Sequence, residues 1–333
     1  MNSQKYHTQD LRTLSFLVTG GAGFIGSNLV EYLLNHGAGK VCVLDNFSTG
    51  YLKNIEKYFS NPAFLFFEGD IQDLDTCRSA VENIDFVSHQ AALGSVPRSI
   101  DDPVTSNNVN VTGFLNMLVA SKDAGVKRMI YAASSSTYGD HPALPKVEDR
   151  IGNPLSPYAV TKYVNELYAQ VFSQIYDFHT IGLRYFNVFG PKQNPQGPYA
   201  AVIPLFIEAA LKNMAPSING DGETSRDFTF VENVVQANIR ALLAPDIMQH
   251  EVVNIAFGDR TTLNQLWKII SEIAGTQIQP RYHDERKGDV KHSIATISKA
   301  EKLFNYQPQV SVEEGLKITL NWYKTALNVI ANT

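Results

Sequence analysis

Two residues four apart in this chain could carry out acid–base chemistry. The stretch SPYAVTK places Tyr158 and Lys162 at i and i+4, directly after Pro157, a residue that can open a helix. Residues at this spacing lie on one helical face, so the two side chains would be neighbours. An ammonium beside a phenol favours the phenolate and lowers the tyrosine pKa from about 10 toward neutrality. Tyr158 is therefore a candidate general base or acid.

A run of hydroxyl side chains marks a second candidate site. The sequence SSSTYG, from Ser134 to Gly139, follows the apolar run MIYAA, which is typical of a buried strand. Open α/β sheets bind their ligands at such strand ends. The run offers serines and a threonine, with no carboxylate or histidine before Asp140. It therefore suits a reaction that needs hydroxyl groups and no acid.

A glycine-rich turn predicts a phosphate-binding site. FLVTGGAGFIGSNLVEYLL places four glycines, in the spacing G-x-x-G-x-x-G, between a predicted strand and a predicted helix. Such a turn lets the backbone approach a pyrophosphate, which then lies at the helix N-terminus. The alternative is a glycine turn without a ligand; a P-loop is excluded because no Gly-Lys-Ser/Thr follows. The candidate cofactor contacts here are Gly20, Gly23, Phe24, Ile25 and Gly26.

Acidic residues after the next two strands favour NAD as the cofactor. Asp45, in VLDNFSTG, stands where a carboxylate would bind the adenosine ribose hydroxyls and repel the 2′-phosphate of NADP. Asp70 and Ile71 follow the third strand, at a point from which a side chain could reach adenine. The alternative for both acids is turn chemistry. We take Asp45, Asn46, Asp70 and Ile71 as candidate cofactor contacts.

The elements that must position these residues alternate through the first half. Strands are predicted at 16–19, 40–44, 64–69, 85–90, 128–133 and 179–186, and helices at 24–36, 73–83, 103–124 and 158–176. This alternation predicts right-handed βαβ units, and the almost wholly apolar strands indicate a sheet covered on both faces. We therefore predict an α/β fold with a Rossmann-type, doubly wound parallel sheet.

The pattern changes after about residue 187, where NVFGPKQNPQGPYAA reads as a loop leaving the sheet. Helices are predicted at 201–213, 230–245, 262–274, 296–304 and 312–326, with short strands in APSING and VVNIA. We predict an NAD-binding domain at 14–188 and 228–258 and a smaller α+β substrate-binding lobe at 189–227 and 259–328. Residues 1–13 are predicted to be a polar N-terminal extension.

Composition excludes several classes of protein. The chain has 333 residues and a net charge of −5, which gives no basic footprint for nucleic acid. No apolar run approaches the roughly 20 residues of a membrane span, and the N-terminus lacks the apolar core of a signal peptide. Cys42 and Cys77 suit a reducing compartment. We expect a cytoplasmic protein without nucleic-acid or membrane partners.

No metal site is expected. His89, His141 and His292 do not stand at metal-ligand spacing with carboxylates or cysteines. Structural hydrogen bonding is the better interpretation of all three histidines.

The glycine turn, the hydroxyl-rich strand end and the Tyr158–Lys162 pair, in this order, resemble the extended short-chain dehydrogenase/reductase family. The resemblance covers nearly the whole chain. It implies that Ser134 assists the catalytic Tyr158, and that Lys162 tunes this tyrosine and binds the nicotinamide ribose of a tightly held NAD. Ala91 and Asn110 are further candidate cofactor contacts.

Comparison with members of that family limits the types of reaction that the resemblance implies. Members that dehydrate nucleotide sugars resemble a T-D-E-V-Y-G pattern, in which acids drive the loss of water, whereas this chain has SSSTYG. The 3,5-epimerising members use a cysteine–lysine pair, and neither Cys42 nor Cys77 suits that role. Removal and return of one hydride remain, which implies a 4-epimerase.

Segments of the second half resemble the family's nucleotide-sugar contacts. The resemblance assigns Asn187, in RYFNVFGP, to the phosphate region, and Arg226 and Arg286 to the pyrophosphate. The planar guanidinium fork suits such phosphate contacts, although either arginine alone would more often be a surface ion-pair partner. The candidate sugar contacts are Gly94, Ser95, Ser135, Ser136 and Gln193, for which the alternative is hydrogen bonding within loops.

The residue type at position 293, here Ser293, indicates which sugar the chain could accept. UDP-galactose 4-epimerases restricted to non-acetylated sugars resemble the stretch GDVKHSIA but have a bulky tyrosine at this position. A serine would leave room for an N-acetyl group beside C2. The chain thus looks most like the bacterial UDP-N-acetylglucosamine 4-epimerases of surface-polysaccharide pathways, such as lipopolysaccharide synthesis, which form UDP-N-acetylgalactosamine.

Several alternatives remain open. UDP-N-acetylglucosaminuronic acid would want a cation near C6, for which Arg98 and Lys192 are candidates, and UDP-glucose/UDP-galactose is a third pair. An NAD(P)H-dependent reductase would share the Tyr158–Lys162 pair but release its cofactor, and a dinucleotide sensor would lack the pair. The resemblance also implies a homodimer that joins through a four-helix bundle of the helices at 103–124 and 156–176.

Overall fold

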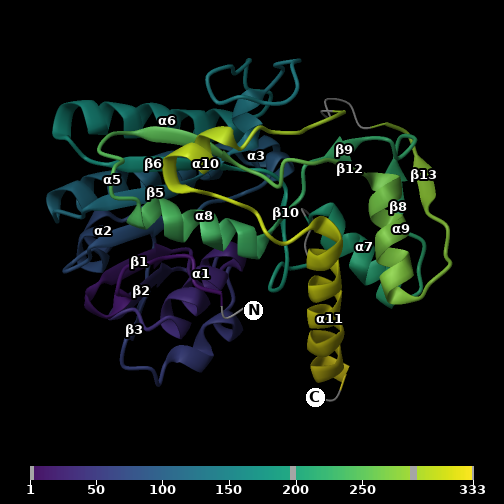
Figure 1. The fold of residues 1–333 in the computed structure, drawn as a ribbon, viewed down its shortest axis with the longest axis horizontal. Helices are drawn as coiled ribbons and strands as arrows, with labels where there is room; N and C mark the ends of the chain where they lie inside the picture. Colours follow the sequence, from purple (N-terminus) through teal and green to yellow (C-terminus); the bar gives the residue numbers. More distant parts are fainter. Residues whose placement is uncertain (1–3, 196–199, 286–290, 332–333) are drawn as a thin grey trace.

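A computed structural model describes residues 4–195, 200–285 and 291–331. Its centre is a seven-stranded parallel sheet in the order β11-β6-β5-β4-β1-β2-β3 (Figure 1). The strands are β1 (Ser15–Thr19), β2 (Lys40–Asp45), β3 (Phe64–Glu68), β4 (Phe86–His89), β5 (Arg128–Ser134), β6 (Thr180–Tyr185) and β11 (Glu251–Ile255). Strand order reverses between β1 and β4, so the predicted doubly wound Rossmann-type sheet is confirmed.

Helices cover both faces of the sheet, which explains why the strands are apolar along their whole length. One face packs against α1 (Phe24–Asn35), α8 (Val231–Leu243) and α10 (Ser298–Phe304). The other face packs against α2 (Leu74–Ala80), α5 (Gly113–Asp123) and α6 (Pro157–Tyr176). Short 3₁₀ turns lie at η1 (Leu11–Thr13), η2 (Leu52–Asn54), η3 (Glu56–Tyr58) and η5 (Ser135–Tyr138).

The helix predicted at 103–124 is one helical run with a change of pitch. It consists of α4 (Pro103–Asn107), the π-helical η4 (Asn108–Thr112) and α5, and the residues at the junctions keep helical backbone angles. Such π turns often occur at functional sites. A short helix that the sequence did not reveal, α3 (Val96–Asp101), precedes it.

A second layer of small elements lies to one side of the sheet (Figure 1). It contains α7 (Val202–Leu211), α9 (Leu263–Ala274) and α11 (Val312–Ala331), with the pairs β7–β10 (Val188–Phe189, Thr229–Phe230), β9–β12 (Ser225–Arg226, Thr261–Thr262) and β8–β13 (Ser217–Asn219, Arg281–His283). A capping box between Thr262 and Gln265 starts α9, and Gly275 in the left-handed conformation ends it. The three helices and the strands β7, β8 and β10 contribute to an aromatic-rich core.

Two segments pack with the sheet although the predicted boundaries place them elsewhere. Helix α10 lies inside the predicted lobe range 259–328, yet Ala300, Phe304 and Tyr306 belong to the core beneath the sheet. Tyr6 and Leu11, within the predicted polar extension 1–13, are buried in the same core. The domain boundaries themselves remain a prediction.

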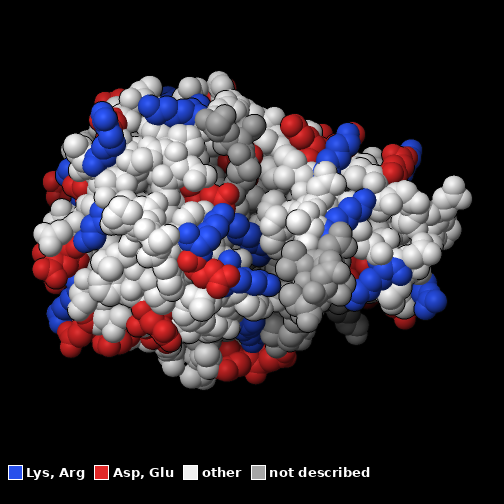
Figure 2. Space-filling view, turned by 90° about the horizontal axis from the view of Figure 1, so that it is seen from below, with Lys and Arg blue, Asp and Glu red and all other residues white. Residues whose placement is uncertain are grey.

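The surface carries charges of both signs. On the face seen in Figure 2, acidic and basic side chains are interspersed, and neither sign covers it continuously. Over the described ranges, none of the helices combines the length and the hydropathy that crossing a membrane requires.

Candidate active site

A cavity of about 500 Å³ opens at the carboxyl ends of the strands, where the strand order reverses. Doubly wound sheets bind ligands at this position. The structure brings most of the predicted residues together here: the cavity is lined by Gly20, Gly23, Phe24, Ile25, Gly26, Asp45, Asn46, Asp70, Ile71, Ala91, Gly94, Ser134, Ser135, Tyr158, Lys162 and Asn187.

The glycine turn approaches other backbone too closely for side chains. A Cβ atom on Gly26 would lie 2.2 Å from the carbonyl oxygen of Gly20. Gly20 itself has φ +66°, and a Cβ atom there would lie 2.7 Å from the nitrogen of Ala91. Helix α1 begins directly after Gly23, without a side-chain cap on its first N–H groups. This open helix N-terminus on the cavity wall fits the pyrophosphate of a dinucleotide.

Asp45 connects the glycine turn to the end of β2. Its carboxylate accepts hydrogen bonds from the backbone nitrogens of Ala22 at 2.9 Å and Phe47 at 2.8 Å. Burial raises the pKa of Asp45, and these two N–H groups oppose that shift. Asn46 donates to Asp70 at 2.9 Å, which joins the ends of β2 and β3. The arrangement fits the adenosine end of NAD.

Tyr158 and Lys162 lie on the first turns of α6, at the opposite end of the cavity. Ser156 caps this helix by accepting a hydrogen bond from the backbone nitrogen of Ala159. The Lys162 ammonium lies 5.9 Å from the centre of the Tyr158 ring and donates to the carbonyl oxygen of Ala132 at 2.8 Å. Helix α6 and strand β5 thereby fix both side chains and Ser134 on one wall.

The electrostatics of this wall correct one expectation. Burial raises the pKa of Tyr158 above its ordinary value, and the hydrogen bond with Ser134 offsets only part of this increase. Burial also lowers the pKa of Lys162 to about 8, and its ammonium is directed at the carbonyl of Ala132. The predicted net lowering of the tyrosine pKa by Lys162 is therefore wrong for the protein alone, because desolvation is the larger effect.

A second cavity of about 580 Å³ lies beside the first. It is lined by residues of α7, β8 and β9, including Arg226, and Asn187 lines both cavities. The Asn187 amide donates to the carbonyl oxygen of Asp227 at 3.0 Å, and Arg226 donates to the carbonyl oxygens of Ser225 and Lys291. Asn187 therefore lies where the first cavity, which could hold a dinucleotide, meets the second cavity, which is lined by the cationic side chain of Arg226.

Several predicted contacts lie outside both cavities. Asn110 is buried behind the first cavity, where its side chain bonds the backbone of Leu93 and the hydroxyl of Thr161. Ser95 caps α3, and Ser136 donates to the Ser134 hydroxyl at 2.9 Å. These residues support elements that carry lining residues.

Two further predicted sugar contacts, Gln193 and Ser293, also line neither cavity. Gln193 donates to the carbonyl oxygen of Val188 at 3.2 Å. The backbone of Ser293 donates to Ser225 at 3.1 Å, and its buried hydroxyl has no hydrogen-bond partner in the described part of the chain. Arg286 lies outside the described residues.

The histidines differ from one another. His89 bonds the hydroxyl of Thr19 at 2.8 Å, and burial lowers its pKa to about 3; His292 bonds that of Ser225 at 2.9 Å. The predicted structural bonding is confirmed for these two rings. The buried Nδ1 of His141 has no partner among the residues described. Within the same residues, no cluster of His, Cys, Asp and Glu is arranged to hold a metal ion.

Two polar residues of the first cavity, Gln90 and Tyr185, were not predicted from the sequence. Gln90 and Tyr185 line the cavity and bond each other at 3.2 Å, and both contact Asn238 of α8. Their positions at the ends of β4 and β6 were the available signal. Ser48 and Thr49, which follow Asp45 in VLDNFSTG, also line the cavity.

Comparison with known proteins agrees with this geometry. Residues 16–256 match the profile of the "NAD dependent epimerase/dehydratase family". The chain belongs to this family. The predicted enzyme class, its NAD cofactor and the family resemblance are thereby confirmed, and the residues of the first cavity fit that cofactor.

Three similar proteins match this chain over most of their length. The putative UDP-glucose 4-epimerase of Methanocaldococcus jannaschii is 38% identical over 92% of this chain and 98% of its own. The structure of UDP-glucose 4-epimerase from Thermotoga maritima with UDP-glucose is 39% identical, with a TM-score of 0.88 over 94% of this chain and 100% of that chain. UDP-N-acetylglucosamine 4-epimerase from Methanobrevibacter ruminantium M1, in complex with UDP-N-acetylmuramic acid, is 38% identical, with a TM-score of 0.89 over 94% and 99%.

Proposed function

We propose that this enzyme interconverts UDP-N-acetylglucosamine and UDP-N-acetylgalactosamine by inverting C4. The observation that carries the proposal is the wall of the first cavity formed by Ser134, Tyr158 and Lys162. Among the described lining residues the only carboxylates are Asp45 and Asp70, three and four strands away from β5. A wall with proton-transfer groups and no nearby acid supports oxidation and reduction of one alcohol without loss of water.

In this mechanism the chain's own residues hold the sugar and move one proton. Bound NAD would supply the acceptor, and later the donor, of a hydride. Tyr158, as the phenolate, accepts the proton of the 4-hydroxyl group, and Ser134 orients the phenol. The 4-ketose would turn about its pyrophosphate bonds and present its other face, where Tyr158 would return the proton to the 4-oxygen while the bound cofactor would supply the hydride to C4. Arg226 and Asn187 hold the nucleotide while the sugar turns, because the second cavity is separate from the catalytic wall.

The N-acetyl group is the finer part of the proposal. Ser293 lies beside Ser225, next to Arg226, and its small side chain would leave more room for an N-acetyl group at C2 than a tyrosine would. The similarity to the UDP-N-acetylglucosamine 4-epimerase of M. ruminantium M1 supports the same assignment. UDP-glucose is the alternative that the other two relatives favour.

The uronic acid alternative loses one of its candidate cations. The Lys192 ammonium is paired with Glu31 of α1 at 2.7 Å. A carboxylate at C6 would therefore depend on Arg98 or on another cation.

Proton NMR of the purified protein with UDP-N-acetylglucosamine and no added NAD tests the proposal. Growing signals of UDP-N-acetylgalactosamine are expected, because the cofactor is regenerated in each cycle. Turnover of UDP-glucose or of the uronic acid alone would replace the proposed substrate. Consumption of NADH by a ketone, without epimer formation, would identify a reductase and overturn the proposal.

Substitution of Ser293 tests the pocket at C2. Ser293→Tyr is expected to lower kcat/KM for UDP-N-acetylglucosamine by about tenfold or more, since filling a pocket changes discrimination by about 1–3 kcal/mol. UDP-glucose turnover in the same variant serves as the control and should change little. Equal losses with both substrates would contradict the role of Ser293 at C2.

We also propose a cytoplasmic homodimer that joins through α6 and the α4–α5 run. The outer face of α6 exposes Val160, Leu167, Val171 and Ile175, a single apolar stripe, and Val104 of α4 is 68% exposed. Such a face is self-complementary in a two-fold dimer. A mass of two chains in light scattering is expected, and a monomer at micromolar concentration would contradict it. The free thiols of Cys42 and Cys77 support the compartment.

A further inference from the structure

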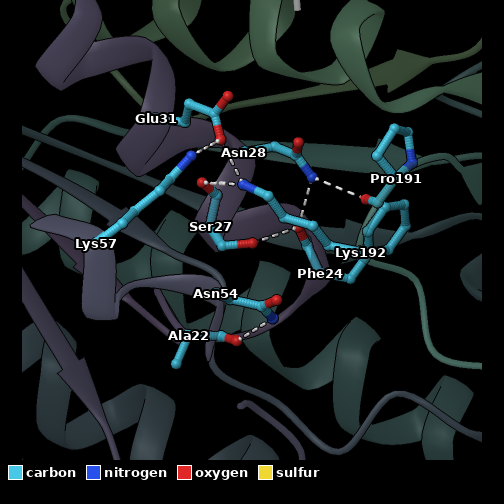
Figure 3. Close-up of polar contacts among 9 residues, drawn as sticks. All are labelled: Ala22, Phe24, Ser27, Asn28, Glu31, Asn54, Lys57, Pro191 and Lys192. Atoms are coloured by element: carbon cyan, nitrogen blue, oxygen red, sulfur yellow. Dashed lines mark hydrogen bonds and ion pairs between the residues drawn. The ribbon is translucent and has the colours of Figure 1, made fainter. Parts of the chain in front are cut away.

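The segment at 190–194, between β7 and α7, is fastened to the helix that follows the glycine turn. The Lys192 ammonium reaches α1, where it pairs with Glu31 at 2.7 Å and donates to the carbonyl oxygen of Ser27 at 3.2 Å (Figure 3). We call Ser27, Glu31 and Lys192 the α1 brace. It connects residues more than 160 positions apart in the chain.

A second contact runs parallel to the brace. The Asn28 amide donates both to the carbonyl oxygen of Phe24, at 2.8 Å, and to that of Pro191, at 3.3 Å (Figure 3). Phe24 is the first residue of α1 and lines the first cavity. The segment at 190–194 is therefore hydrogen-bonded to the first turn of α1, the turn whose N–H groups would bind the pyrophosphate of NAD.

In the sequence, the braced segment lies between residues that line the first cavity and residues that line the second. It follows Asn187 and Val188, which line the first cavity, and precedes Val202, which lines the second. Its other contacts are with distant elements: the Tyr323 hydroxyl of α11 donates to the Gln193 carbonyl, and Asn194 donates to the Tyr51 hydroxyl. Through these contacts the segment joins α1 to α11 and to Tyr51.

Burial makes the brace a strong constraint. The side chains of Lys192 and Glu31 are only 10% and 16% exposed, so solvent screens their attraction weakly. Lys192 also has φ +72°, a conformation that a non-glycine residue keeps only when its surroundings hold it. Lys57 approaches the same Glu31 carboxylate from η3 at 3.2 Å, but its side chain is 55% exposed (Figure 3).

We infer that Glu31 and Lys192 are positioning residues that retain NAD: the buried pair holds α1 against the segment at 190–194 and thereby slows the release of the cofactor. Gly23, Phe24 and Gly26, at the start of α1, line the first cavity, so a less firmly held α1 would let this wall open and the dinucleotide leave sooner. An enzyme that returns its hydride to the same substrate gains from slow release, because loss of the reduced cofactor would strand the 4-ketose. The inference itself rests on NAD binding and not on the identity of the sugar.

The test compares NAD content and NAD release in purified variants, without any sugar present. Lys192→Met and Glu31→Gln are expected to release NAD about tenfold faster than the wild type, the size of typical coupling between sites. Lys57→Met is the matched control, since it removes the exposed partner of the same carboxylate, and should release NAD within about twofold of the wild-type rate. In the double variant Glu31→Gln/Lys192→Met, release should be no faster than in Glu31→Gln alone.

Two outcomes would overturn the inference. One is a wild-type release rate in Lys192→Met; the other is a rate in Lys57→Met equal to that in Lys192→Met, which would indicate a general effect of charge near Glu31. If Glu31→Gln or Lys192→Met does not fold by circular dichroism, Lys192→Gly decides, because glycine accepts φ +72° without strain. Slow release from folded Lys192→Gly would exclude the brace as the cause of retention.

Discussion

The two cavities are built in different ways. Backbone shapes the first: it lies at the ends of one parallel sheet, where Gly20 and Gly26 have no room for a Cβ atom. Side chains shape the second, which lies among α7 and the short strands β8 and β9 and includes Leu205, Phe206 and Arg226. A backbone-built site tolerates few changes of residue type, whereas a side-chain-built site can exchange its lining and so change the ligand it selects.

The largest effect is expected at the catalytic wall of the first cavity. Tyr158→Phe should lower kcat by about 10³-fold, within the range of lost general acid–base catalysis, because the other phenol among the described lining residues, Tyr185, is bonded to Gln90 and Asn238. The NAD content of the purified protein should stay at the wild-type level, since the substitution leaves the glycine turn intact. A variant that keeps normal turnover would show that Tyr158 does not transfer the proton.

The next effect contrasts two glycines of the first cavity. In Gly26→Ala the new methyl group would overlap the backbone carbonyl of Gly20. Neither a methyl group nor a backbone carbonyl has a rotamer change that could relieve this overlap. We expect a loss of about 3 kcal/mol in the free energy of unfolding, the upper end of overpacking, together with loss of bound NAD. Urea denaturation and the NAD content of the purified protein measure the two effects.

Gly94→Ala is the control for Gly26→Ala, because a Cβ atom on Gly94 would have no heavy atom within 4 Å. Its stability and NAD content should match the wild type. Equal damage from both substitutions would contradict the view that close backbone approach distinguishes the glycine turn from the rest of the cavity.

A third effect separates the two cavities. Arg226→Ala should raise KM for the UDP-sugar by about tenfold or more, because a hydrogen bond to a charged group contributes about 1.5–3 kcal/mol. The kcat value should stay nearly constant, since a grip on the nucleotide serves ground state and transition state alike. NAD release should also be unchanged. Faster NAD release would show that the cavities are not independent at Arg226.

The same difference explains how much the sequence could predict. The sheet, the glycine turn, Asp45 and Tyr158–Lys162 were predictable because each depends on a short stretch: a turn between strand and helix, a strand end, or two residues one helical turn apart. Backbone constraints of this kind restrict the residue type at a position, and the restriction is visible in one sequence.

The second cavity and its surroundings depend on contacts between distant segments. Two-residue strands such as β9 leave no periodic pattern, and the packing of α10 on the sheet follows from partners far away in sequence. Asn110 was expected at the cofactor but is turned toward the backbone of Leu93 from a π-helical turn, which hydrophobic periodicity does not reveal. The pairing of Lys192 with Glu31 could not be predicted from the sequence either, and Lys192 was therefore a candidate to bind the carboxylate of a uronic acid sugar.

The smallest effect concerns how the catalytic wall sets the pH dependence of the reaction. Burial raises the pKa of Tyr158, and the Ser134 hydrogen bond opposes this shift. Ser134→Ala should therefore raise the tyrosine pKa further. Because the phenolate is the active form and its population grows with pH, the acidic limb of kcat/KM should move to higher pH, by about half a unit to one unit for a lost hydrogen bond of about 1 kcal/mol.

Ser136→Ala is the matched control for that shift. The Ser136 hydroxyl donates to the Ser134 oxygen at 2.9 Å, so its removal leaves Ser134 in place beside the phenol. Its pH profile should follow the wild type. If the limb stays fixed in Ser134→Ala, or moves to lower pH, Ser134 does not stabilise the phenolate, and the first cavity would depend on its bound cofactor alone to favour the charged form of Tyr158.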